Sequence, residues 1–209
     1  MTDWFGRLKR GFRKETVGRS APSGSLDSAI PTYPWFGLVQ GEDLEQGDIF
    51  ENCPIFLPPE TIPTSGTPIV RWEERDLILM SQSCDIVKGR ERIQQGMLCE
   101  VWMRSEFKPG NPLASLDTLE RVRKGQIPRH HMLADSVIPG FERELRIVDL
   151  QQVHSIPISF LRIRAAEKSR LRVLPPYREH LSQAFARVYM RVGLPIDIPS
   201  LKSSKANKE

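Results

Sequence analysis

The sequence has little of what marks several common protein classes. Its three cysteines, Cys53, Cys84 and Cys99, are an odd number without Cys-x-x-Cys spacing. They predict neither a disulfide framework nor a cysteine-rich zinc site, and they favour a reducing compartment. No apolar run approaches the ~18 residues that span a bilayer. The N-terminus also lacks the uninterrupted apolar region of a secretory signal, so we expect a soluble, cytoplasmic protein.

Cofactor and metal signatures are absent as well. The sequence has no Gly-rich phosphate loop, no zinc-finger or RRM signature and no His-Glu-x-x-His spacing. His130 and His131 are adjacent, so on a strand their side chains point to opposite faces and do not readily share a metal ion. The sequence therefore predicts no metal and no cofactor.

Charge is unevenly distributed along the chain. The formal net charge is +4, but residues 1–19 hold six Lys/Arg against two acids, and residues 162–191 hold eight against two. Residues 20–161 hold thirteen against twenty, so two basic segments flank an acidic middle. Clustered arginines are typical of phosphate contacts with a nucleic acid, whereas the alternative is pairing with the acidic middle of the same chain. The residues predicted to contact nucleic acid are Arg164, Lys168, Arg170, Arg172 and Arg178.

Composition divides the chain into three parts. Residues 1–34 are a basic amphipathic segment followed by a Ser/Pro/Gly-rich linker. Three roles are open for residues 1–19: docking in the groove of a protein partner, lying on an anionic membrane, or forming a mobile arm. Residues 35–199 are expected to form a single globular domain, and residues 200–209 a disordered tail. The sequence does not indicate the oligomeric state.

Short strands dominate the globular part. Apolar and alternating runs predict strands near residues 49–50, 69–72, 76–81, 97–103, 130–133 and 144–150, with an irregular loop over 58–68. A short helix is expected over 115–124, with Ser115 as its N-cap and Gly125 after its end. A closing helix begins at Pro176 and ends at Gly193. The pattern predicts an α+β fold, mainly β, as a small bent sheet or SH3-like barrel with an inserted short helix and a C-terminal amphipathic helix.

The polar string Ser81-Gln82-Ser83-Cys84-Asp85 follows a buried apolar strand and places a thiol beside a carboxylate. Cys84 would act as a nucleophile if a histidine such as His154 approached it, with Asp85 orienting that base. His130 and His131 are the other available bases. The alternative is a small, buried cysteine at a strand end, with Asp85 capping a turn.

Three segments occur in the order found in a known family. They are Gly47-Asp48-Ile49, the run at 75–81 and the run at 95–101. Together they resemble strands of the PemK/MazF family, small SH3-like barrels that include ribosome-independent RNA-cleaving toxins. The resemblance implies that Arg75 is the catalytic arginine and Ser105 its hydroxyl-bearing partner. An arginine in that role stabilises the negative charge that develops at an RNA phosphate.

The leading hypothesis is therefore a bacterial, toxin-antitoxin-like protein that binds nucleic acid, with metal-independent RNA cleavage as the activity that the resemblance implies. The alternatives are a thiol-dependent enzyme that uses Cys84 and a noncatalytic adaptor that docks through residues 1–19. A groove lined by Arg75 and Ser105 would favour RNA. Cys84 within hydrogen-bond reach of a histidine would favour thiol chemistry.

Overall fold

The computed structural model describes residues 33–57, 59, 61 and 70–190. The chain divides into two units, residues 1–32 and 33–209, and every described residue belongs to the second unit. The expectations for the basic N-terminal segment, for most of the loop at 58–68 and for the tail at 200–209 lie outside the described residues.

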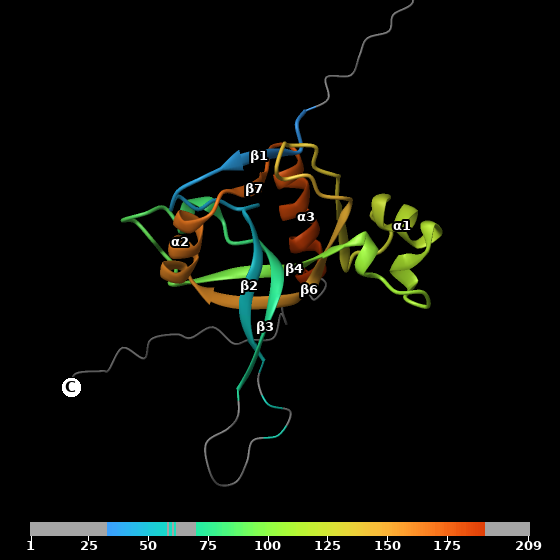
Figure 1. Ribbon diagram of the computed structural model, residues 1–209, viewed down its shortest axis with the longest axis horizontal. Helices are drawn as coiled ribbons and strands as arrows, with labels where there is room; N and C mark the ends of the chain where they lie inside the picture. The colour runs from blue at the N-terminus through green and yellow to red at the C-terminus, as the bar shows by residue number, and fades with distance from the viewer. Residues whose placement is uncertain (1–32, 58, 60, 62–69, 191–209) are drawn as a thin grey trace, which may run out of the picture. The chain divides into compact units, whose positions relative to one another are not determined.

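A five-stranded antiparallel sheet forms the centre of the described part (Figure 1). Its order is β2 (Ile49–Leu57), β3 (Arg71–Leu79), β4 (Gln95–Met103), β6 (Arg146–Pro157) and β5 (His130–Leu133). The predicted pairing of the 75–81 run with the 97–103 run is confirmed, because residues 76–79 of β3 pair with residues 98–101 of β4. The predicted strand over 130–133 is also confirmed. The strand predicted over 144–150 begins at Arg146 and extends to Pro157, and the strands predicted over 69–72 and 76–81 form one strand, β3.

A second, two-stranded sheet pairs β1 (Phe36–Val39) with β7 (Arg170–Val173). An isolated bridge between Asp48 and Arg172 connects β7 to the residue just before β2. Among the described residues the strands therefore form two antiparallel sheets, and they do not close into one barrel. The α+β, mainly β class is confirmed at this level.

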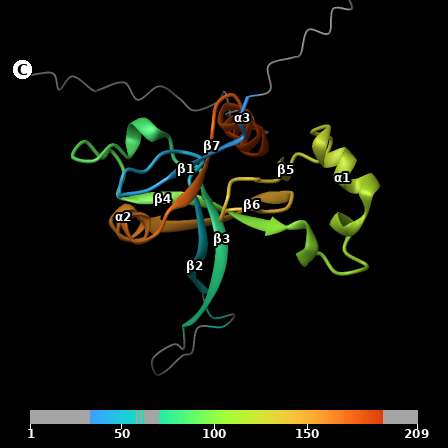
Figure 2. The same ribbon diagram turned by 45° about the horizontal axis from the view of Figure 1, so that its top comes forward.

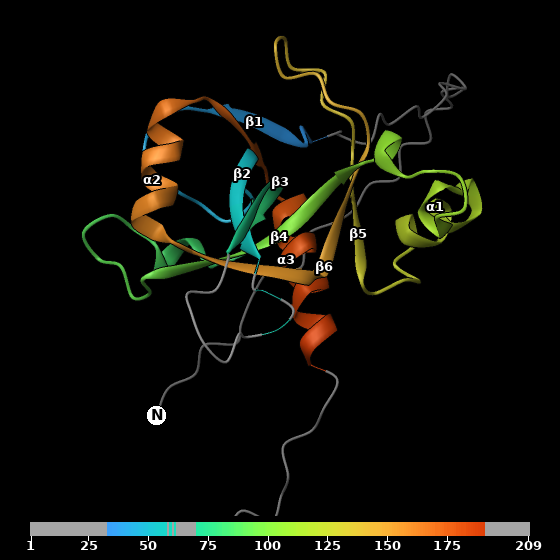
Figure 3. The same ribbon diagram turned by 60° about the horizontal axis from the view of Figure 1, so that its bottom comes forward.

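Three α-helices accompany the sheets: α1 (Leu116–Arg123), α2 (Ile158–Glu167) and α3 (Tyr177–Tyr189). The two predicted helices, α1 and α3, are confirmed, and the Ser115 hydroxyl accepts a hydrogen bond from the Thr118 amide as an N-cap. Helices α1 and α2 lie at opposite ends of β4 and β6 (Figures 2 and 3). None of the helices in the described part is long and apolar enough to cross a membrane.

Helix α2 and strand β7 were not predicted. Residues 162–172 belong to the segment predicted from its arginines to contact nucleic acid, whereas most of them lie in these two elements. Helix α2 packs closely on β4 at Gly96, where a Cβ atom would lie 3.0 Å from Leu161 and 3.1 Å from Ile158. A glycine at this position permits the close approach.

The sheet buries apolar side chains on both faces. Because side chains alternate along a strand, Ile78 of β3 packs in the cluster that includes Leu181 of α3, while Leu77 and Leu79 pack in the cluster that includes Leu161 of α2. Each such side chain contributes roughly 1.5–3 kcal/mol when fully buried. A smaller cluster lies under α1.

Candidate nucleic-acid interface

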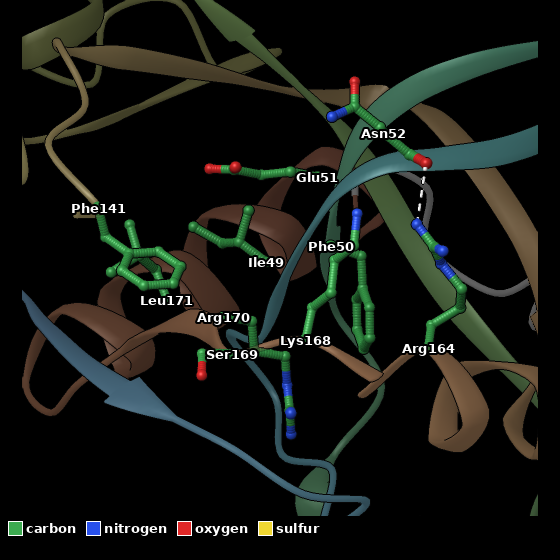
Figure 4. Close-up of a pocket in the computed structure, with 10 residues that line it drawn as sticks. All are labelled: Ile49, Phe50, Glu51, Asn52, Phe141, Arg164, Lys168, Ser169, Arg170 and Leu171. Atoms are coloured by element: carbon green, nitrogen blue, oxygen red, sulfur yellow. Dashed lines mark hydrogen bonds between the residues drawn. The ribbon is translucent and has the colours of Figure 1, made fainter. Parts of the chain in front are cut away.

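Three of the five residues predicted to contact nucleic acid line one cavity, called here the basic pocket. Arg164, Lys168 and Arg170 lie around a volume of about 360 Å³, beside the start of β2 and the segment that joins α2 to β7 (Figure 4). The complete lining of the basic pocket is Ile49, Phe50, Glu51, Asn52, Phe141, Arg164, Lys168, Ser169, Arg170 and Leu171.

A bulge in β2 shapes one wall of the basic pocket. The register between β2 and β3 shifts between Phe50 and Cys53, and Asn52 inside the bulge has a φ of 51°. Asparagine tolerates this left-handed conformation better than most residues do. The Asn52 carbonyl accepts a hydrogen bond from Nη2 of Arg164 at 3.2 Å, drawn as a dashed line in Figure 4. The bulge therefore positions the Arg164 guanidinium at the pocket.

Lys168 and Arg164 supply the accessible positive charge of the basic pocket. Lys168 is exposed and forms no ion pair within the described part of the chain. Nη1 of Arg164 pairs with Glu167 at 3.2 Å on the surface of α2, which leaves Lys168 as the unpaired cation of the lining within the described residues. The carboxylate in the lining, Glu51, is already bound by Nε and Nη2 of Arg143 at 2.7 and 2.6 Å. A phosphate entering the pocket would therefore meet net positive charge.

Arg170 and Arg172, in contrast, are structural arginines. They are 5% and 9% exposed, and both bind the fully buried carboxylate of Asp48. Nε of Arg170 and Nη2 of Arg172 each lie 3.0 Å from Oδ2 of Asp48. Further N–H groups of both side chains donate to the backbone carbonyl of Asp43. This corrects the surface role predicted for these two residues, because their donors are satisfied inside the fold.

Arg178 is likewise paired within the chain. At the start of α3, its Nη1 lies 3.0 Å from the Glu45 carboxylate and its Nη2 lies 3.1 Å from that of Glu179. Arg178 does not line the basic pocket, so the structure does not bring it together with Arg164 and Lys168.

Arg75 lies in a second cavity of about 600 Å³, called here the acidic cleft. Its guanidinium binds the Glu73 carboxylate, donates to the Glu74 carbonyl at 3.0 Å and lies 5.6 Å from the centre of the Trp102 ring. The charged groups that line the acidic cleft are Arg75 and Arg143 together with Glu51, Glu74, Asp76, Glu106, Glu142 and Glu144. Six carboxylates against two arginines would repel a phosphate backbone.

Ser105 does not line the acidic cleft beside Arg75. It lies in a single 3₁₀ turn after β4, where its amide donates to Oε1 of Glu144 at 3.1 Å and its hydroxyl binds the same carboxylate. Glu144 does line the cleft, so the structure connects Ser105 to it only through that residue. The geometry does not present Arg75 and Ser105 as a reactive pair.

Cys84 is exposed, which corrects the interpretation of a buried cysteine at a strand end. It lies in a short 3₁₀ turn, Ser83–Asp85, with Sγ 3.8 Å from Oδ1 of Asp85. Asp85 in turn lies 3.7 Å from Arg92. His154 belongs to a different cluster, and no histidine of the described residues hydrogen-bonds to the thiol. The described residues also contain no group of three side chains suited to a metal ion.

A third cavity, of about 480 Å³, contains buried polar residues that sequence reasoning did not group. We call it the bulge cleft because the register between β4 and β6 shifts between Cys99 and Glu100. Glu100 faces Asp149 across the two strands, and Oε1 of Glu100 lies 2.8 Å from Nε2 of His154. The sequence did contain a signal for this site, since Glu100 and Asp149 each lie inside an apolar run of a strand. A buried carboxylate needs a partner, so each of them indicates a polar cluster.

Neighbouring side chains shift the pKa of the Asp149 carboxylate. Nε of Arg129 lies 3.0 Å from both carboxylate oxygens, and its Nη2 lies 2.6 Å from Oδ2. Burial alone would raise the pKa of Asp149, but the hydrogen bonds from Arg129 and the Gln151 amide outweigh it and lower the pKa. Burial lowers the pKa of His130, whose Nε2 lies 3.9 Å from Asp149.

No protein-family model and no curated protein matches the chain. The resemblance of three segments to the PemK/MazF family stays a prediction.

Proposed function

We propose that the protein binds nucleic acid and that the basic pocket holds a backbone phosphate. The observation that carries the proposal is the convergence of Arg164 and Lys168 on one cavity, with the Asn52 bulge fixing the arginine. A guanidinium gives a planar fork of donors and an ammonium gives a point charge, and both bind phosphate oxygens well. The proposal concerns binding, since the acidic surroundings of Arg75 do not favour RNA cleavage there.

We also propose a barrel-like arrangement of the two sheets. The Asp48–Arg172 bridge and the hydrogen bond from the Val173 amide to the Gly47 carbonyl support it, because they place β7 beside the start of β2. In that arrangement the strands would follow one another as β1-β7-β2-β3-β4-β6-β5. The basic pocket would then lie at the junction of the two sheets.

Fluorescence anisotropy with labelled single-stranded RNA and DNA tests the binding proposal. Affinity should fall steeply with added salt, because each neutralised phosphate releases condensed counterions. The Lys168→Ala and Arg164→Ala variants should each bind several-fold more weakly, and each should reduce the slope of log K against log salt by about 1.

Lys88→Ala is the matched control, because it also removes one exposed lysine and Lys88 does not line the basic pocket. It should leave both affinity and salt slope close to those of the wild-type protein. Equal affinities for the Lys168, Arg164 and Lys88 variants would exclude the basic pocket as the phosphate site.

A further inference from the structure

The bulge cleft combines a hydrogen-bond acceptor, a donor and an aromatic wall. It lies between β4, β5, β6 and the segment that carries α1. The lining residues that carry the argument are Glu100, Trp102, Phe107, Arg129 and Asp149. Its volume of about 480 Å³ is within the range of small-molecule sites.

Glu100 is the acceptor. It is 7% exposed, and one of its carboxylate oxygens is bound by His154. The second oxygen, Oε2, has no hydrogen-bond partner among the residues that the structure describes, although Glu100 lines the cleft. A buried carboxylate with one open oxygen gains much from a ligand that donates N–H groups.

Arg129 is the donor. Asp149 binds its Nε and Nη2, and this leaves Nη1 without a partner in the described part of the chain. The Arg129 side chain is 45% exposed, so it can reach a ligand while Asp149 fixes its orientation. Donor and acceptor line the same cavity, and Asp149, which binds Arg129, is the register partner of Glu100.

The remaining lining suits a flat ring. Trp102 and Phe107 lie with their ring centres 6.5 Å apart, and Leu113 and Ile127 add apolar surface. Carboxylates outnumber cations in the lining, which contains Glu100, Glu106 and Asp149 but a single arginine, Arg129. Burial lowers the pKa of His130, so its imidazole does not add a positive charge near neutral pH. A phosphate group is therefore disfavoured in the cleft, whereas a neutral base with N–H donors is not.

The bulge itself is held in place. Residues 150–152 of β6 have no partner in β4, and the Tyr189 hydroxyl of α3 donates to the Leu150 carbonyl at 2.8 Å. The Gln151 amide donates to Oδ1 of Asp149 at 3.0 Å. Bulges often re-aim side chains at functional sites, and this one directs Asp149 and Gln152 to the cleft.

We propose that the bulge cleft binds a guanine base. Guanine presents O6 and N7 as acceptors, which suit an arginine, and N1–H and the 2-amino group as adjacent donors, which suit a carboxylate. Arg129 would donate to the first edge, and Oε2 of Glu100 would accept from the second. Adenine offers a donor in place of O6 and has no 2-amino group. The inference rests on the proposed function, in that the base would belong to the bound nucleic acid.

Titration of the wild-type protein with free nucleosides tests this inference without a phosphate. Binding is followed by NMR through the indole N–H signal of Trp102, assigned with Trp102→Phe. Guanosine should bind, inosine, which lacks the 2-amino group, should bind about tenfold more weakly, and adenosine should not compete. Equal binding of the three nucleosides, or no shift of the Trp102 signal with guanosine, would overturn the proposal.

Glu100→Gln tests the acceptor. This variant should bind guanosine no better than the wild-type protein binds inosine, whereas Glu120→Gln, on the exposed side of α1, should bind guanosine normally. If Glu100→Gln does not fold, the nucleoside series on the wild-type protein still decides. Guanosine binding without oligonucleotide binding would remove the proposed function alone, and oligonucleotide binding without guanosine binding would remove this inference alone.

Discussion

Asp48 joins two arginines at the point where the two sheets meet. The carboxylate is fully buried and binds Arg170 and Arg172. Asp48→Asn would leave the buried Arg170 with no carboxylate partner and Arg172 with Glu45 alone, so we expect a loss of about 3–5 kcal/mol in the free energy of unfolding. Urea denaturation followed by circular dichroism measures it.

Asp85→Asn provides the comparison at an exposed ion pair. Asp85 lies 3.7 Å from an Arg92 side chain that is 75% exposed, so its loss should cost less than about 1 kcal/mol. Similar costs for the two variants would contradict the structural role assigned to Asp48.

His131 makes stability depend on pH. Burial, with a smaller effect of nearby His180, lowers its pKa to about 4 from an unperturbed 6.5. Between those values the unfolded chain binds more protons than the folded protein, so stability should fall as pH decreases from about 6.5 to 4. At full effect this shift corresponds to roughly 3 kcal/mol.

The variant His131→Gln should therefore show a flatter dependence of unfolding free energy on pH in that window. His180→Gln, which removes an exposed histidine, should keep most of the slope. Thermal denaturation at a series of pH values compares the two, and an unchanged slope in His131→Gln would assign the pH dependence to other groups.

The contact between β4 and α2 depends on Gly96. A Cβ atom there would lie 3.0–3.2 Å from Leu161, Ile158 and Leu79, all in the packed core. Gly96→Ala should therefore destabilise the protein by about 1–3 kcal/mol through overpacking. Gly37→Ala in β1 is the control, because its nearest contacts, to Leu174, begin at an ordinary 3.4 Å. Chemical denaturation of both variants would detect the difference.

Elements with local signals could be predicted from the sequence, whereas those set by tertiary contacts could not. Helix α1 has Ser115 as a cap, and α3 has apolar residues at helical spacing. Helix α2 lacks that spacing, because Phe160 and Ile163 place apolar residues on more than one face of the helix. Strand β7 alternates arginine with apolar residues, and its arginines suggested a charged surface segment. The two arginines of β7, Arg170 and Arg172, lie in a strand because both pair with Asp48, which is distant from them in the sequence.

Tertiary contacts also decide which residues form the candidate sites. Arg164 and Lys168 were predicted and line the basic pocket, but nothing in the sequence distinguishes them from the buried Arg170 and Arg172. The pairing of an arginine with a distant carboxylate is decided only by the fold. Glu100, Asp149 and Arg129 meet through a bulge between two strands, and no spacing in the sequence encodes that bulge.

The distribution of charge along the chain differs from the distribution of charge on the surface of the described part. Much of the excess in residues 162–191 is neutralised by the acidic middle, through pairs such as Arg162 with Glu91 and Arg178 with Glu45. What remains is local: a basic pocket and an acidic cleft that share Glu51 and Asn52 in their linings. Nucleic acid approaching the basic pocket must therefore also experience the neighbouring carboxylates.

This proximity predicts a gain of affinity. Glu74 and Glu142 are exposed and line the acidic cleft, so the double variant Glu74→Gln/Glu142→Gln should bind single-stranded RNA more tightly than the wild-type protein at low salt. The gain should shrink as salt rises, because the Debye length falls from about 10 Å at 0.1 M to about 3 Å at 1 M. Anisotropy titrations over that range measure it, with Glu120→Gln as a control outside both linings. Unchanged affinity at low salt would place the bound strand away from the acidic cleft, and therefore away from the basic pocket that adjoins it.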